Sequence, residues 1–200
     1  MEFSGTVSID GTTTEEVWLA LSDPVMIKQA LPGCQFLVEC EDEDPDFDAL
    51  AASAPEEDPP TLPEASAEDI AERAFEEGGH YAALMEISVG SVSPSFETVV
   101  TIEEREFPRM HAAGEGSASS SSFEMSSGME LAESEDGVDV EWWAEADVFG
   151  RVAQMGQRVI NPVANRVVGR FFDQVEKQLQ DVSTDSESSG GLRSRVSSLF

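Results

Sequence analysis

Basic residues are scarce in this sequence. The 200 residues include 41 Asp and Glu but only 11 Lys and Arg, which gives a formal net charge of -30. Only two of the basic residues are lysines, Lys28 and Lys177. An anionic surface repels phosphate backbones, which argues against DNA or RNA as a partner. Two explanations of the charge remain, an acidic interaction protein or a halophile's adaptation to high salt. The spread of acid over nearly every segment favours the second.

Cysteine, histidine and long apolar runs are scarce too. If residues 34–40 form an extended strand, Cys34 and Cys40 lie about 20 Å apart, beyond the reach of a disulfide. The two histidines, His80 and His111, make no zinc-like cluster. The N-terminus lacks the features of a signal peptide, and no run is long enough to span a membrane. We therefore expect reduced thiols and a cytoplasmic protein.

Motifs of catalysis are missing as well. The sequence has no glycine-rich phosphate loop, no nucleophile elbow and no metal-spaced His or Cys set. Acidic pairs are common, but most fall on outward faces, where solvation explains them better than catalysis. The sequence thus predicts a binding protein rather than an enzyme, with no catalytic or metal-binding residues and no covalent cofactor.

Apolar residues are sufficient for a core, at 40% of the chain, and their spacing predicts the elements. Residues 2–10 alternate as a half-buried strand. Thr13 and Glu16 form a capping box that starts a helix, and a second short helix covers Val25 to Ala30. A strand over 35–39 follows. Beyond residue 79 the alternation resumes in a series of strands joined by Gly, Pro and Asp turns, which is typical of an antiparallel meander.

From Gly150 the apolar period changes from 2 to 3.6, which predicts one long helix that Asn161-Pro162 bends or interrupts. We therefore expect an α+β helix-grip fold. In this fold a curved antiparallel sheet wraps around a long C-terminal helix, and two short helices follow the first strand.

The segment 41–78 differs in composition from its surroundings. Residues 41–77 contain 15 acidic residues, one base (Arg73) and five prolines. Such a segment buries little, so we expect a largely disordered insertion within one domain, formed by 1–40 and 79–181. Residues 66–77 could form a short acidic helix with Ser66 as N-cap and an apolar stripe of Ile70, Ala74 and Phe75.

Several motifs, taken with their spacing, resemble one known family. They are Met1 to Gly5, Val17-Trp18, Asp23-Pro24, Leu31-Pro32-Gly33-Cys34, Gly114-Glu115-Gly116, Gly150 to Arg158, and Phe171-Phe172. The chain resembles the family of the carbon monoxide dehydrogenase G subunit (CoxG), in the START-like (SRPBCC) superfamily, over residues 1–40 and 79–181. It departs from the family in the 41–77 insert, in Ser119 to Ser122, and in Phe149, which could narrow the mouth of a cavity.

The resemblance implies a cytoplasmic accessory protein of molybdenum-containing carbon monoxide dehydrogenase or a related hydroxylase. It also implies a hydrophobic cavity that carries a prenylated quinone, such as menaquinone, between the membrane and the enzyme. An assembly or recruitment factor without cargo, and a START-like enzyme of the cyclase or aromatase type, remain as alternatives.

The inward faces are rich in methionine, whose flexible, polarizable side chain suits a variable apolar guest. We expect the sheet and the helix to enclose a ligand cavity, with Thr98, Ser127 and Gln154 as candidate polar contacts. The predicted cavity residues are Met85, Ile87, Phe96, Thr98, Met110, Phe123, Met125, Met129, Trp142, Met155, Val159 and Phe171.

The C-terminus contrasts with the rest of the chain. Residues 182–191 read as a flexible tether, and residues 192–200 contain no acid. These last nine residues form either an unstructured end or a short amphipathic anchor for a membrane surface or a partner groove. The docking residues in the second case are Leu192, Arg193, Arg195, Val196, Leu199 and Phe200.

Overall fold

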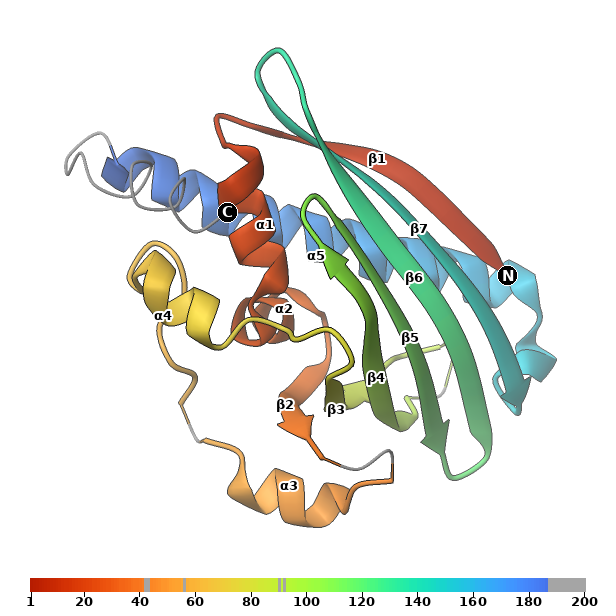
Figure 1. The fold of residues 1–200 in the computed structure, drawn as a ribbon. Coiled ribbons are helices and arrows are strands. Elements are labelled where there is room, and N and C mark those ends of the chain that lie inside the picture. The colour runs from red at the N-terminus through yellow and green to blue at the C-terminus, as the bar shows by residue number, and fades with distance from the viewer. Residues whose placement is uncertain (42–43, 56, 90, 92, 187–200) are drawn as a thin grey trace.

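One curved antiparallel sheet and one long helix dominate the structure. The computed structural model describes residues 1–186, except 42–43, 56, 90 and 92. Figure 1 shows the sheet curving past helix α5 (Gln157–Ser186), with strands in the order β1-β7-β6-β5-β4-β3-β2. These strands are β1 (Glu2–Asp10), β2 (Cys34–Cys40), β3 (His80–Glu86), β4 (Ser95–Glu106), β5 (Arg109–Ala118), β6 (Ser121–Glu133) and β7 (Gly137–Gly150). The predicted helix-grip fold is confirmed.

Two short helices follow the first strand along the chain, as the sequence predicts. Helix α1 (Thr14–Ser22) begins with the capping box: the Thr13 hydroxyl accepts from the Glu16 N–H at 3.2 Å, and the Glu16 carboxylate accepts from the Thr13 N–H at 3.0 Å. Asp23 then caps α2 (Pro24–Ala30), because its carboxylate accepts from the Val25 N–H at 3.0 Å. These caps satisfy backbone donors that the helix starts would otherwise leave unpaired.

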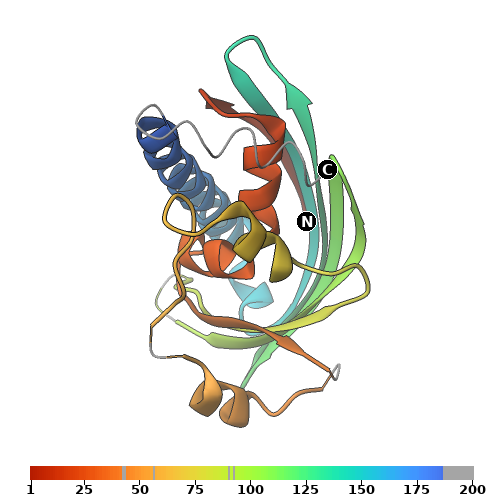
Figure 2. The same cartoon turned by 60° about the vertical axis from the view of Figure 1, so that its left-hand side comes forward.

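The main hydrophobic core lies at one end of the sheet. The fully buried side chains of Trp18, Met26, Val140 and Leu179 come from α1, α2, β7 and α5. The core therefore fixes the C-terminal half of α5 against the two short helices. Figure 2 shows α1 and α2 between this part of α5 and the sheet.

The acidic segment contributes to this core, which differs from the expectation of a largely disordered insertion. It contains α3 (Phe47–Ser53) and α4 (Ala67–Glu72), and Ser66 caps α4 as predicted by accepting from the Asp69 N–H at 3.1 Å. Leu62, Ile70 and Phe75 are buried in the main core. Composition alone does not predict this packing, because the segment has few apolar residues and several of them lie together in the main core.

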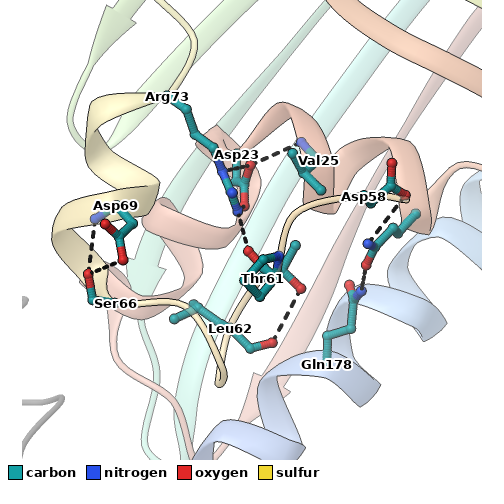
Figure 3. A network of polar contacts seen from close by, with 11 residues as sticks. Asp23, Val25, Asp58, Thr61, Leu62, Ser66, Asp69, Arg73 and Gln178 are labelled. Atoms are coloured by element: carbon teal, nitrogen blue, oxygen red, sulfur yellow. Dashed lines mark hydrogen bonds and ion pairs between the residues drawn. The ribbon is translucent and has the colours of Figure 1, made fainter. Parts of the chain in front are cut away.

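Two ion pairs join the acidic segment to the rest of the fold, and Figure 3 shows the one between Arg73 and Asp23. The Arg73 guanidinium donates to both carboxylate oxygens of Asp23, at 2.9 and 2.6 Å, and also to the Pro60 carbonyl at 2.9 Å. The Lys28 ammonium lies 2.6 Å from the Asp58 carboxylate. The segment is therefore tied to α2 and to the α1–α2 junction.

Helix α5 starts later than the sequence predicts. Strand β7 continues to Gly150, and a 3-10 turn, Ala153–Met155, precedes Gln157. Gly150 and Gly156 have φ of +77° and +75°, values that favour glycine and redirect the chain before the helix. The helix then runs without interruption through Pro162, where the sequence predicts a bend or break.

The C-terminal predictions are tested only in part. Helix α5 continues to Ser186, so the first residues of the predicted tether 182–191 are helical. The predicted docking tail, 192–200, lies outside the described residues. Within the described part of the chain, none of the helices has the length and apolar character needed to cross a bilayer.

Candidate ligand-binding site

The inner face of the sheet carries small residues at its centre. In the registered strands β5, β6 and β7, one cross-strand row is Ala112, Ser127 and Ala144, and the next contains Gly114 and Ala146 on either side of Met125. They share a face with the core residues Leu131 and Val140 because side chains in a strand alternate. Unlike these two core residues, the residues of both rows are only half-buried. The centre of the inner face is therefore a shallow, incompletely covered concavity.

The opposing helix changes its packing along its length. In its C-terminal half, Phe172, Val175 and Leu179 are 8%, 0% and 0% exposed, and the helix packs there against α1 and α2. In its N-terminal half, the apolar residues Val159, Val163, Val167 and Phe171 are only half-buried. This half of α5 is therefore less completely covered than the C-terminal half.

A pocket of about 270 Å³ opens between β1, β7 and α5. Gly5, Val7 and Trp142 form its sheet side, and Asn165, Val168, Gly169 and Phe172 form its helix side; Thr6, Asp173 and Glu176 complete the lining. The indole of Trp142 lies against Gly5, since a Cβ at that glycine would be 3.2 Å from the indole nitrogen. The pocket, hereafter the β1–α5 pocket, lies at the β1 edge of the sheet.

Trp142 Nε1, at this pocket, is buried without a hydrogen-bond partner among the described residues, and so are Thr98 Oγ1 and Asn161 Oδ1, which do not line the pocket. Buried polar groups in proteins are nearly always paired, and an unpaired one costs roughly 1–3 kcal/mol. The indole can only donate, whereas the hydroxyl can donate or accept. The Asn161 oxygen can only accept, so the indole and the hydroxyl are the two groups that suit a ligand carbonyl oxygen.

The far end of the inner face is packed. Met85 and Phe96 are buried in a second apolar cluster with Val152, against which Ile87, Phe123, Met155 and Val159 pack. Phe96 and Phe123 meet edge-to-face, with ring centroids 5.3 Å apart. Thr98 is also buried here, and a Cβ at Gly116 would be 2.8 Å from its hydroxyl oxygen. This cluster closes one end of the concavity.

The other predicted cavity residues lie toward the main core. Met110 is buried in that core, and Met129, Trp142 and Phe171 pack against it. Met125 is half-buried between Gly114 and Ala146 in its cross-strand row, and its Cγ would lie 3.3 Å from a Cβ at Gly114. Of the predicted cavity residues, the structure brings only Trp142 into the β1–α5 pocket.

Two candidate polar contacts have other roles. Gln154 is exposed in the turn before α5, and the Ser127 hydroxyl donates to the Ala112 carbonyl at 3.5 Å. The expectation that Phe149 narrows a cavity mouth is wrong, because its side chain is 49% exposed and Val148, one residue earlier, is the one that packs inward.

Sequence reasoning missed the pocket residues Gly5, Asn165, Val168 and Gly169. The available signal was Gly169, a glycine inside a long helix, where glycine costs about 1 kcal/mol relative to alanine. A Cβ at Gly169 would meet no heavy atom of another part of the chain within 4 Å. Packing within the chain therefore does not require this glycine.

The buried acids serve the fold. Glu16 and Asp23 are the acidic residues buried among those described, and they cap α1 and α2. Burial raises the pKa of the Cys34 thiol from 9.0 to about 11, although nearby Lys28 partly offsets this, so the thiol stays neutral and weakly nucleophilic at neutral pH. Cys34 and Cys40 form no disulfide, and no metal-binding group of His, Cys, Asp or Glu occurs in the part of the chain that the structure describes.

Solved structures with the same architecture define the class of protein. A conserved protein from Geobacillus kaustophilus is 19% identical, with a TM-score of 0.65 over 93% of this chain and 97% of that chain. A protein from Thermus thermophilus is 9% identical, with a TM-score of 0.58 over 92% and 99%. The Zhui aromatase/cyclase from a Streptomyces species is 10% identical, with a TM-score of 0.55 over 96% and 98%. These likenesses show that the chain has the helix-grip fold.

Within this class, the family model of the carbon monoxide dehydrogenase G subunit (CoxG) matches residues 73–180, more than half of the chain. The chain belongs to the CoxG family. None of the curated proteins matches it.

Proposed function

We propose that this protein is an accessory protein of a molybdenum-containing carbon monoxide dehydrogenase or related hydroxylase. In this role it binds a prenylated quinone, such as menaquinone, between the sheet and the N-terminal half of α5, and moves it between membrane and enzyme. Family membership supports the enzyme partner, and the incompletely filled concave face supports the apolar cargo.

The observation that carries the quinone assignment is the unpaired Trp142 indole N–H at the β1–α5 pocket. A quinone carbonyl accepts a hydrogen bond but needs no counter-charge, which matches a site lined mainly by apolar groups. A fatty acid is less suitable, because no basic side chain among the described residues lines the pocket to pair with its carboxylate.

The half-buried Met125 and Met129 on the sheet suit a guest whose length varies. The prenyl tail would lie along the cross-strand row of Ala112, Ser127 and Ala144, whose side chains are small. The packed cluster around Phe96 and Phe123 would limit its depth.

Extraction of the purified full-length protein with organic solvent, followed by mass spectrometry, tests the proposal. We expect a prenylated quinone at close to one molecule per chain after expression in a quinone-producing host. The Gly169→Trp variant, which fills the pocket mouth with an indole, should lose most of it, and Gly169→Ala should retain it. Absence of quinone, together with no binding of added menaquinone, would instead favour an assembly factor without cargo.

An enzymatic role is the second candidate, since one similar fold is that of an aromatase/cyclase. Such chemistry needs an acid and a base facing the ligand. Of the described residues that line the β1–α5 pocket, Asp173 and Glu176 are acidic, and none is a basic residue. Aromatase or cyclase activity that is lost in Asp173→Asn would favour the enzyme.

A further inference from the structure

The longest acid-free stretch of this acidic chain spans residues 148–172. It contains four arginines, Arg151, Arg158, Arg166 and Arg170, and no Asp or Glu, although the chain has 41 acids. Asp147 and Asp173 bound the stretch on either side. The stretch comprises the end of β7, the turn after it, and the N-terminal half of α5. Salt adaptation of the whole surface would not leave this one region without acid.

All four arginine side chains are exposed, and among the described residues none of them takes part in an ion pair. Other basic residues do have carboxylate partners: Arg73 with Asp23 and Lys28 with Asp58. With 30 more negative than positive charges on the chain, intramolecular partners are abundant. Four guanidiniums in one region that find no such partner therefore indicate a surface shaped for an external anion.

This arginine face, defined as Arg151, Arg158, Arg166 and Arg170, adjoins the β1–α5 pocket. Asn165 and Gly169 line the pocket, and Arg166 and Arg170 are their immediate neighbours on the helix. Figure 2 shows α5 at the outside of the molecule, with no described element covering the side turned away from the sheet. The exposed Phe149 precedes the same helix at the end of β7.

We propose that the arginine face docks the protein on the phosphate headgroups of an anionic lipid bilayer, with the pocket mouth at the interface. Guanidinium groups bind phosphate in a bidentate manner, and each basic residue near an anionic bilayer adds to the attraction. The exposed aromatic ring of Phe149 can enter the headgroup region. The acidic remainder of the protein is repelled, so it fixes the orientation of docking.

The inference rests on the proposed carrier function for its purpose, because docking at the mouth lets an apolar ligand leave the bilayer without crossing water. Docking itself depends only on charge and exposure. The two can therefore fail separately: vesicle binding reports on the arginine face, and quinone content reports on the pocket.

Flotation of the full-length chain with phosphatidylglycerol vesicles, and with phosphatidylcholine vesicles as the neutral comparison, tests the proposal at about 0.1 M salt. We expect binding to the anionic vesicles only. The triple variant Arg158→Gln, Arg166→Gln, Arg170→Gln should bind at least about tenfold more weakly, because three attractive charges are lost. Arg109→Gln, which removes an exposed arginine from β5, is the matched control and should bind as the parent does.

The variant Arg158→Lys, Arg166→Lys, Arg170→Lys controls for a folding defect. It keeps the three positive charges and should retain most of the vesicle binding. All variants keep residues 187–200, so a difference in vesicle binding between them cannot come from the loss of these residues. Equal flotation of the Gln and parent proteins overturns the proposal. Failure of the parent protein to bind anionic vesicles also overturns the proposal. This holds as well if the arginine face instead binds the purified enzyme partner. Loss of quinone with intact flotation counts against the carrier function and leaves docking standing.

Discussion

The guanidinium of Arg73 lies 2.6 Å from a carboxylate oxygen of Asp23, fifty residues away in sequence. Asp23 is fully buried, and it also caps α2. Arg73 is the single base of the acidic segment, so this pair joins the segment to the α1–α2 junction. The segment is therefore part of the fold through this ion pair, the Lys28–Asp58 pair and its buried apolar residues.

Removing this contact should destabilise the whole domain. In Arg73→Ala the buried Asp23 carboxylate loses its bidentate partner, and we expect a loss of about 3 kcal/mol in the free energy of unfolding. Urea denaturation followed by far-UV circular dichroism measures it. Arg109→Ala, whose ion pair with Glu104 is more exposed, should lose less than about 1 kcal/mol. Equal effects of the two substitutions would contradict the structural role of Arg73.

Trp142→Phe separates ligand binding from stability. It removes an indole N–H that is buried without a partner among the described residues, so the free energy of unfolding without ligand should change by less than about 1 kcal/mol. The increase in melting temperature on adding menaquinone should shrink, because the carbonyl loses its donor. Trp143→Phe, on the outer face beside His111, should retain the full increase. An undiminished increase in Trp142→Phe would exclude the indole as a ligand contact.

Gly169→Leu should obstruct the pocket without harming the fold. A Cβ at this position meets nothing in the chain, and leucine favours a helix by up to about 1 kcal/mol over glycine, so the melting temperature should stay or rise. The larger side chain should slow the association of menaquinone, measured by stopped-flow tryptophan fluorescence. Gly169→Ala should be as stable and associate at the parent rate. Association of Gly169→Leu at the parent rate would show that the ligand enters elsewhere.

Cys34 should resist alkylation. Its pKa of about 11, raised by burial from 9.0, lowers the thiolate fraction at pH 8 by roughly 100-fold. In a Cys40→Ser variant, where Cys34 is the only thiol, iodoacetamide labelling monitored by mass spectrometry should be slow at pH 8 in buffer and fast in urea.

The same pKa shift has a consequence for stability. A folded-state pKa above the unfolded one means that burial of neutral Cys34 contributes fully below about pH 9 and is lost as the pH rises through 11. Cys34→Ala should weaken this part of the pH dependence. A thiol that reacts equally in buffer and urea would contradict its burial.

Much of the fold could be predicted because its signals are local. The Thr13–Glu16 capping box, the Ser66 cap and the period-2 strands depend on neighbouring residues, and each occurs as predicted. The packing of Leu62 and Ile70 into the core could not be predicted, because it depends on contacts between distant segments that composition does not report. The start of α5 was missed because two glycines with positive φ redirect the chain.

The candidate site was harder to predict than the fold. Alternation identifies which residues face inward, but not which of them fill the interior. Met85 and Phe96 are buried at one end, whereas Met125 and Ala144 at the centre are only half-buried. Whether a side chain such as Trp142 finds a polar partner depends on tertiary geometry alone.

The most direct test of the carrier function is the indole N–H resonance of Trp142 in a nitrogen-15 correlation spectrum. The chain has three tryptophans, Trp18, Trp142 and Trp143, so three indole signals can be assigned with single Phe variants. On titration with a short-chain menaquinone, we expect a large shift of the Trp142 signal that saturates at one ligand per chain, with Trp143 unmoved. A Trp142 signal that stays in place at saturating ligand would contradict the carrier function.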